Sequence, residues 1–493
     1  MVGLWIGPKY NRHVLPAFDG HVYDSIAESP QIFTLPPWGY RILEPWIVHF
    51  IPARSNAEGF YWLNLCLLAG SVYIVGSWLR RLGFSSEGAA LAAAALAISP
   101  PVLTQLDYQV LVDPLALLLL VLALRELVSP DLLVLMALAA AAALTKETSL
   151  LLLILVPIAL IPRFGWKRGL LDAAMVSLPA LTLMIVLRLI WGNPIPAAHR
   201  SIWNLSLERL VNSAAALSLA ALLSGLTVIA AVGLFREKSI ELRAFGVLMW
   251  IFTFGLIVSN PYQYSVADLP RLSLFAWPPL LPLALSGLGF KRAPPSPIGG
   301  ASKRWRAVPA IALLLVCCAL VAATDPYQRA PFEANPNPVA LAGRLRETLK
   351  TARLLDQGGT FVFDARSGRF AEPIREAFNL TEGRRQRWFL YNGFGPDAAF
   401  GSGAPELRHN AELIVPILNP RDMVMTFEVA GQSYIPIFIS HRQVGEIFGG
   451  RGAQTIRIGA NDLVRGDNIV RLETYTDDAI RILRFEVSLQ PES

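Results

Sequence analysis

Apolar segments joined by short connections fill the chain up to about residue 323. A helix needs about 20 apolar residues to cross a bilayer, and the pattern predicts about ten such spans. They cover residues 57–79, 88–103, 110–128, 132–144, 149–161, 170–191, 210–235, 244–259, 272–289 and 307–323. The two segments that flank Lys146 are much shorter than the others, so we expect them to be tilted, broken or buried inside the protein.

After residue 324 the period of the pattern changes. A proline-rich stretch and a predicted helix at 339–355 are followed by short runs in which apolar and polar residues alternate, as in half-buried strands. The apolar positions of the two clearest runs are Met423, Met425, Phe427 and Val429, and Leu483, Phe485, Val487 and Leu489. Glycine-containing turns separate the runs at the spacing of an antiparallel sandwich. The sequence therefore predicts a β-sandwich over residues 357–493.

The composition excludes a disordered chain and an ordinary soluble enzyme. Of the 493 residues, 54% are hydrophobic and 16% are charged, and the mean hydropathy is +0.45. The net charge of +6 comes from 43 basic and 37 acidic residues. This near balance favours a membrane topology, and no nucleic-acid partner is expected. The three cysteines lie in apolar segments and predict neither a disulfide framework nor a metal site.

Basic residues are concentrated in alternate connections between the predicted spans. One set holds Arg80, Arg81, Arg125, Arg163, Lys167, Arg168, Arg236, Lys238, Arg243, Lys291, Arg292, Lys303, Arg304 and Arg306. The other set holds little beyond Lys146, Arg200 and Arg271. Because Lys and Arg collect on the cytoplasmic side, the second set is expected outside, in a multi-pass protein of the plasma or bacterial inner membrane.

This orientation predicts four parts. Residues 1–56 form a first extracytoplasmic loop with interfacial helices, and residues 57–323 form the transmembrane helical domain. Residues 324–356 are a linker and a helix, and residues 357–493 are an extracytoplasmic β-sandwich domain.

Candidate chemistry begins in the N-terminal loop, where residues 18–27 and 38–46 are rich in polar and aromatic side chains. One interpretation is a surface helix at the headgroup layer, which Trp and Tyr favour. The other is that Asp19, held beside the bilayer, is a general base that deprotonates an acceptor hydroxyl.

A family resemblance supports the second interpretation. The first periplasmic loop of the GT-C glycosyltransferases, such as the mannosyltransferase-like membrane enzymes, resembles Asp19-Gly20-x-x-Tyr23-x-x-Ile26-Ala27 followed by Tyr40-Arg41-Ile42-Leu43-x-Pro45. These polytopic enzymes use lipid-phosphate-linked sugars, and the family's catalytic carboxylate occupies the place of Asp19. The resemblance extends over about residues 15–290.

Two acidic or mixed segments fit the same resemblance. Leu111-Val112-Asp113-Pro114 looks like the family's second acidic element, with Asp107 just before it; alternatively, Asp113 is a carboxylate favoured by a helix N-terminus. Leu144-Thr145-Lys146-Glu147-Thr148 lies at a predicted outer turn, where the resemblance implies a lysine that reaches the donor phosphate. Its alternative is a simple interfacial turn with Lys146 and Glu147 paired.

A third segment holds Tyr264 and Asp268-Leu269-Pro270-Arg271-Leu272, and it resembles the family segment in which an arginine precedes an apolar helix that contains proline. Arg271 would bind phosphate in a bidentate manner. The alternative is an arginine that snorkels at a helix end.

The resemblance implies an α-helical, polytopic, GT-C-like hexosyl- or pentosyltransferase of cell-envelope glycan assembly. It would move a sugar from a polyprenyl-phosphate donor to a hydroxyl of a glycan, lipid or protein at the outer face. Asp19 would be the base, and Lys146 and Arg271 would hold the phosphate leaving group. The substrate-binding residues would be Tyr23, Arg41, Asp107, Asp113, Glu147 and Tyr264. A single base without a second nucleophile implies inversion at the anomeric carbon.

Neither a P-loop nor a GxGxxG fingerprint follows a predicted strand, so nucleotide use is not indicated. The sequence predicts no cofactor and no metal site, and leaves dependence on a divalent cation open. In the sandwich, Thr381-Glu382-Gly383-x-x-x-Arg387-Trp388 and Leu463-Val464-Arg465-Gly466-Asp467-Asn468 resemble segments of jelly-roll modules that bind carbohydrate. Trp388, Phe389 and Tyr391 would stack on sugar rings; buried aromatic side chains of a small core are the alternative.

Three other functions stay in competition with the enzyme. A transporter of lipid-linked saccharides should contain internal repeats, and the sequence shows none. A scaffold that presents the sandwich would not need so many spans. The third is an inactive homologue. Enzymes of this class have a span before the first outer loop, and only 18 residues precede Asp19 here, so either the true start lies upstream or the chain lost its first helix.

Overall fold

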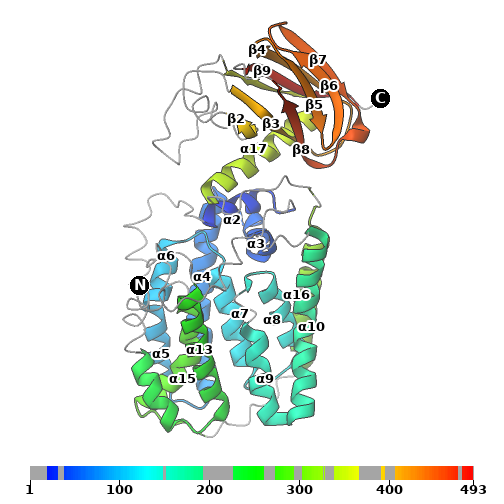
Figure 1. Ribbon diagram of the computed structural model, residues 1–493. Helices are drawn as coiled ribbons and strands as arrows, with labels where there is room; N and C mark the ends of the chain where they lie inside the picture. Colours follow the sequence, from blue (N-terminus) through cyan, green and yellow to red (C-terminus); the bar gives the residue numbers. More distant parts are fainter. Residues whose placement is uncertain are drawn as a thin grey trace. The chain divides into compact units, whose positions relative to one another are not determined.

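The computed structural model describes residues 19–31, 38–147, 151–191, 226–259, 273–293, 303–325, 327, 338–365, 390–394, 406–475 and 480–491. The chain divides into two compact units, Met1–Thr324 and Asp325–Ser493. The first unit is built of helices, and the second holds one long helix and an antiparallel sheet (Figure 1).

The helices of the first unit follow one another with short connections. They are α2 (Asp19–Glu28), η1 (Trp38–Tyr40), α3 (Leu43–His49), α4 (Asn56–Arg81), α5 (Ser86–Ala97), α6 (Pro100–Asp107), α7 (Asp113–Glu126), α8 (Leu132–Ala143), α9 (Leu151–Phe164), α10 (Trp166–Trp191), the helix Leu226–Arg236, α13 (Ile240–Ser259), η4 (Leu274–Ala276), α15 (Trp277–Gly287) and α16 (Lys303–Ala322). Every apolar segment predicted from the sequence contains one of these helices.

Local signals set several of these boundaries. The Ser55 hydroxyl accepts a hydrogen bond from the amide of Glu58 and caps α4. The Asp131 carboxylate accepts hydrogen bonds from the first amides of α8. Two consecutive prolines, Pro100 and Pro101, start α6 and separate it from α5 by a bend of 48°. The predicted span 88–103 is therefore two helices.

The central helices α7 and α8 are apolar around their whole circumference and are buried around nearly all of it. Every residue from Ala137 to Ala143 in the alanine-rich α8 is buried, so neighbouring helices approach its backbone closely. At 1.5 Å per residue, the 14 residues of α7 extend about 21 Å, less than the roughly 30 Å hydrocarbon thickness. The short segment before Lys146, α8, thus lies inside the bundle, whereas α9 after it buries one face and exposes Ile154.

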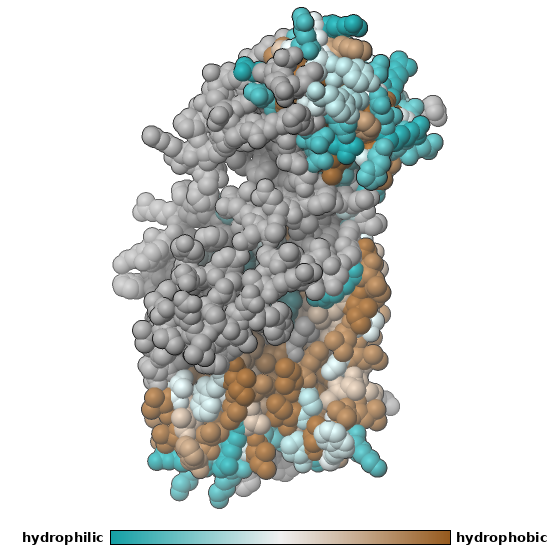
Figure 2. All heavy atoms as spheres, viewed as in Figure 1, coloured by the Kyte–Doolittle hydropathy of each residue, from teal (hydrophilic) through white to brown (hydrophobic). Residues whose placement is uncertain are grey.

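Other helices expose apolar side chains at helical spacing. On α10 these are Leu171, Met175, Leu178, Ile185 and Leu189, and on α16 they are Val308, Ile311 and Leu315. Figure 2 shows hydrophobic residues over the described surface of the helical unit and hydrophilic ones at the end where α9 passes into α10. A continuous apolar surface of this kind identifies a protein that lies in a membrane.

The number of spans predicted from the sequence is not confirmed by the described residues. Among the described residues, two helices are long and apolar enough to cross a membrane, α4 and α10, and a third span results if the bent pair α5 and α6 is counted as one. Five more apolar helices are shorter than 18 residues. The prediction of about ten spans is therefore not confirmed, because hydropathy alone does not tell a buried half-length helix from a full crossing.

Basic connections meet at one end of the helical unit. Arg163 pairs with Glu241 at the start of α13 and also donates to the carbonyl of Leu127, just after α7. Arg292 pairs with Glu237 (2.9 Å) and donates to the carbonyl of Leu82 (2.8 Å). These contacts join the connections that charge counting placed on one side. Which side faces the cytoplasm stays a prediction.

The second unit begins with α17 (Pro338–Asp356). Its strands are β1 (Thr360–Asp364), β2 (Leu390–Phe394), β3 (Glu406–Ile417), β4 (Met423–Ala430), β5 (Tyr434–Ile439), β6 (Arg442–Phe448), β7 (Ala453–Ile458), β8 (Gly466–Glu473) and β9 (Ile480–Leu489), with η8 (Ala460–Asp462) before β8. All pairings are antiparallel, in the order β6-β5-β8-β3-β9-β4-β7, with β1 beside β9 and β2 beside β3.

The end strands of this order approach each other. A Cβ placed on Gly445 of β6 would lie 2.9 Å from a methyl group of Ile456 of β7, so the sheet curls on itself around its core. One hydrogen-bonded network thus joins all the described strands, and the antiparallel prediction is confirmed. A sandwich of two distinct layers stays a prediction.

The predicted alternation holds in β4, where Met423, Met425, Phe427 and Val429 are all buried. In β9, Phe485, Val487 and Leu489 are buried, whereas Leu483 is only half-buried. The register between β4 and β9 shifts beside Leu483, and such a bulge moves one residue out of the alternation.

Candidate functional site

Two neighbouring chain segments organise the candidate site. The amide of Leu43 donates to the carbonyl of Leu144 (3.1 Å), so residues 41–44 run beside residues 144–147. These segments lie between α2, the start of α7 and the end of α8, and each contributes charged side chains to two adjoining ionic groups. We call these groups the arginine cluster (Asp19, Tyr23, Arg41 and Glu147) and the lysine cluster (Glu44, Asn64, Asp113 and Lys146).

In the arginine cluster, α2 presents Asp19 and Tyr23 on one face, because residues four apart are neighbours on a helix. The guanidinium of Arg41 donates from Nη1 to the hydroxyl of Tyr23 and interacts electrostatically with Asp19. Tyr23 is only 1% exposed, and burial raises the pKa of its hydroxyl. The ring is therefore a neutral hydrogen-bonding group beside Asp19.

Arg41 also forms an ion pair with Glu147. Its Nε and Nη2 lie 3.0 and 2.9 Å from Oε2 of Glu147. Burial lowers the pKa of Arg41, but Glu147, Tyr23 and Asp19 outweigh that effect, so the pKa is raised well above its ordinary value. Arg41 is thus a permanent cation that ties the helix of Asp19 to the turn after α8.

In the lysine cluster, Lys146 Nζ lies 2.5 Å from Oδ1 of Asp113, and the two side chains are 6% and 2% exposed. Asp113 is the first residue of α7, where the helix dipole also favours a carboxylate. The ammonium lies 6.0 Å from the centre of the Phe275 ring. The buried pair therefore joins the start of α7 to the residues after α8.

The sequence analysis considered a pair between Lys146 and Glu147, and the structure corrects it. Lys146 pairs with Asp113, and Glu147 pairs with Arg41. Adjacent residues in an extended or turn segment point to opposite sides, so the two charges enter different clusters.

Glu44 was missed by the sequence analysis. It falls at the unspecified position of the motif before Pro45, and it is fully buried in α3. Burial, and then the nearby Asp113 carboxylate, raise the pKa of Glu44 well above its usual range. An acidic residue between Leu43 and Pro45 in an apolar segment is a signal that could have identified it.

Two further residues support the clusters. Asn64 of α4 donates from Nδ2 to the carbonyls of Gln109 (2.7 Å) and Leu111 (2.8 Å) and so holds the turn that leads into Asp113. Arg188, inside the apolar helix α10, lies 4.7 Å from the centre of the Tyr40 ring. Arg188 adds a cation to this end of the bundle. The sequence analysis did not include it, because that analysis counted basic residues only in the connections between the predicted spans.

The remaining predicted residues are not placed with these clusters. Arg271 and Tyr264 lie outside the described residues, as do Trp388 and Phe389. Asp107 ends α6, but its side chain is not described. Among the described residues, no group of three or more His, Cys, Asp or Glu side chains is arranged to hold a metal ion.

Comparisons with known proteins find similarity among solved structures alone. No protein-family model matches it, and no curated protein matches it. Among solved structures, one similar chain is a mutant of the arabinofuranosyltransferase AftD from mycobacteria, determined by single-particle cryo-electron microscopy. The alignment covers 99% of this chain and 60% of that one, with 13% sequence identity and a TM-score of 0.39. The chain thus spans less than two thirds of that protein, and the likeness assigns no family.

Proposed function

We propose that this protein is a membrane glycosyltransferase that moves a sugar from a polyprenyl-phosphate donor to an acceptor hydroxyl at the outer face of the membrane, in cell-envelope glycan assembly. The observation that carries the proposal is the meeting of four ionisable side chains, Asp19, Arg41, Asp113 and Lys146, in two adjoining clusters at one end of an apolar bundle. Charged groups in such a place are costly and are retained for function.

In this proposal Asp19 accepts the proton of the acceptor hydroxyl. The hydroxyl oxygen then forms a bond to the anomeric carbon while the bond from that carbon to the phosphate oxygen breaks, and the electron pair leaves with the polyprenyl phosphate. Direct displacement inverts the anomeric carbon. The ion pair with Glu147 and the bond to Tyr23 would hold Arg41 beside Asp19.

Lys146 would stabilise the leaving phosphate. The contact with the carboxylate of Asp113 would orient the ammonium group of Lys146. The positive charge of Lys146 would attract a phosphate oxygen of the leaving group, and Arg271 would supply a second, bidentate contact. Asp113, Glu147, Asp107 and Tyr264 would then shape the donor and acceptor sites.

The test is turnover of a panel of polyprenyl-phosphate sugars by the purified protein in lipid, followed by release of the lipid phosphate. Asp19→Asn should abolish release, because an amide does not accept the proton. Glu28→Gln is the matched control, since Glu28 is an exposed acid on the same helix, and it should keep wild-type turnover.

Equal turnover of Asp19→Asn and wild type would exclude Asp19 as the base. No turnover with any donor in folded wild-type protein would favour the alternatives, an inactive homologue, a scaffold, or a transporter of lipid-linked saccharides.

A further inference from the structure

A second polar site lies at the other end of the helical unit, among the helix ends that carry the basic connections. A pocket of about 360 Å³ is formed where α4 and α7 end and where α8 and α16 begin. Its volume lies within the range of small-ligand sites. None of the residues in the arginine and lysine clusters lines it.

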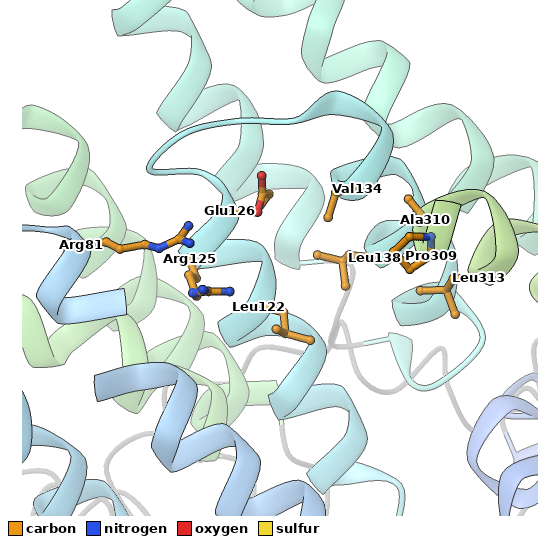
Figure 3. Close-up of a pocket in the computed structure, with 10 residues that line it drawn as sticks. Arg81, Leu122, Arg125, Glu126, Val134, Leu138, Pro309, Ala310 and Leu313 are labelled. Carbon is orange, nitrogen blue, oxygen red and sulfur yellow. The ribbon is translucent and has the colours of Figure 1, made fainter. Parts of the chain in front are cut away.

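The pocket has a charged side and an apolar side. Figure 3 shows Arg81, Arg125 and Glu126 on one side, and Leu138, Pro309, Ala310 and Leu313 on the other. Arg81 and Arg125 stand at the last turns of α4 and α7, so the helix bundle itself brings two guanidinium groups together. The wall opposite them has no polar side chain.

The charge of the pocket matches one anionic group. Two guanidinium groups and the carboxylate of Glu126 leave one net positive charge. The Nε of Arg125 is buried and donates no hydrogen bond within the described part of the chain. A guanidinium group binds phosphate oxygens with a fixed, fork-like set of donors. A phosphodiester with a single negative charge would therefore balance the net positive charge and accept a hydrogen bond from Nε of Arg125.

The apolar wall borders the surface that faces lipid. Pro309 lies inside α16, where it removes a backbone hydrogen bond and limits close packing. Ala137 and Ala310 leave space because their side chains are small. The neighbouring residues Val308 and Ile311 are exposed on the apolar outer face of α16. A molecule in this pocket therefore meets cations on one side and continues into hydrocarbon on the other.

We propose that this pocket binds one anionic membrane phospholipid, whose phosphate lies between Arg81 and Arg125 and whose acyl chain packs against Leu138 and Leu313. A zwitterionic lipid would leave the net positive charge uncompensated. A soluble phosphate ester would gain nothing from the apolar wall, because only a lipid has both parts.

The test uses the full-length protein in detergent and native mass spectrometry to count bound lipids. Phosphatidylglycerol and phosphatidylcholine with the same acyl chains are added separately, and glycerol 3-phosphate is added as a headgroup without chains. We expect wild type to retain phosphatidylglycerol about tenfold better than phosphatidylcholine, since the choline cation cancels the negative charge of the phosphate that attracts the two arginines. Glycerol 3-phosphate at equal concentration should not displace the lipid.

Arg125→Gln should reduce retention of phosphatidylglycerol about tenfold. Arg80→Gln is the matched control: it removes the same charge from the adjacent position of α4, where Arg80 is exposed and bonds to Ser86 outside the pocket. It should retain the lipid as wild type does. Equal losses in both variants, or equal retention of the two lipids by wild type, would overturn the proposal.

Displacement of the lipid by glycerol 3-phosphate would also overturn it, in favour of a soluble phosphate ligand. If Arg125→Gln does not fold, Arg125→Lys keeps the charge but loses the planar fork, and it should retain about threefold less phosphatidylglycerol. Unchanged retention in a folded Arg125→Lys variant would contradict the role of the guanidinium.

Discussion

Lys146 and Asp113 form an ion pair in which neither side chain is more than 6% exposed. The two residues lie 33 positions apart, at the open ends of two consecutive helices. A buried ion pair of this kind stabilises the folded protein little more than an apolar pair of the same size. Removing one partner, however, leaves the other charge buried and uncompensated.

Lys146→Met should therefore destabilise the protein by about 3 to 5 kcal/mol. Thermal unfolding in detergent can be followed with a thiol-reactive dye in a background with the exposed Cys66 and Cys318 replaced by serine, so that the dye reports exposure of the buried Cys317. The double variant Lys146→Met with Asp113→Asn should be more stable than the single variant, because no charge is then left unpaired. A double variant less stable than the single one would contradict this account of the pair.

Stability should depend on pH through Glu44, which lies in α3, outside the candidate spans. Its pKa is raised in the folded state by burial and by Asp113, with Lys146 and Asn64 as the other groups that face it. The stabilisation from its bound proton is fully present below the ordinary pKa of about 4.3 and is lost as the pH rises through the folded-state value.

Wild type should consequently lose stability as the pH increases above that ordinary value, and Glu44→Gln should lose less. The measurement is the unfolding temperature of both proteins across the pH range. Glu87→Gln, which alters an exposed acid of α5, should follow wild type. Parallel curves for wild type and Glu44→Gln would show that Glu44 does not carry the raised pKa.

Tyr23→Phe should lower the free energy of unfolding by about 1 to 3 kcal/mol, since it leaves a guanidinium N–H of Arg41 without its acceptor. If the proposed function holds, turnover should fall as well, because Arg41 would no longer be fixed beside Asp19. Tyr73→Phe removes a hydroxyl from a tyrosine that is 73% exposed and should change neither quantity. Wild-type stability of Tyr23→Phe would argue against the hydrogen bond.

The contact between the helix Leu226–Arg236 and α15 depends on glycine. A Cβ at Gly287 would lie 2.1 Å from the carbonyl oxygen of Ile229, and one at Gly233 would lie 1.7 Å from that of Leu283. Gly287→Ala should push the two helices apart and destabilise the protein by about 1 to 3 kcal/mol. At Gly76 the nearest atom would be 3.7 Å away, so Gly76→Ala should be neutral or stabilise by up to about 1 kcal/mol.

The sequence predicted the helical segments well, because a run of apolar residues in a membrane must satisfy its backbone hydrogen bonds as a helix. It did not predict which helices cross. The residues of α7 and α8 are as apolar as those of α10, but these two helices are about half as long and are buried by their neighbours. That is a property of packing, which one segment read alone does not contain.

Part of the candidate site could be predicted in the same way. Short motifs identified Asp19, Arg41, Asp113 and Lys146, which the structure brings into adjoining clusters. The partner of each charge could not be predicted, because Lys146 and Glu147 are adjacent and their pairing depends on which side of the turn each faces. Arg188 was hidden within an apolar helix.

The pair between Lys146 and Asp113 also bears on how the chain enters the membrane during synthesis. A lysine or aspartate without a partner is costly to bring into an apolar environment, and α7 alone is too short to span. Because α7 and α8 are consecutive and carry the two opposite charges at the same end of their hairpin, both charges can be neutralised before either meets hydrocarbon. The helical hairpin, and not the single helix, is then the unit that the insertion machinery delivers to the bilayer.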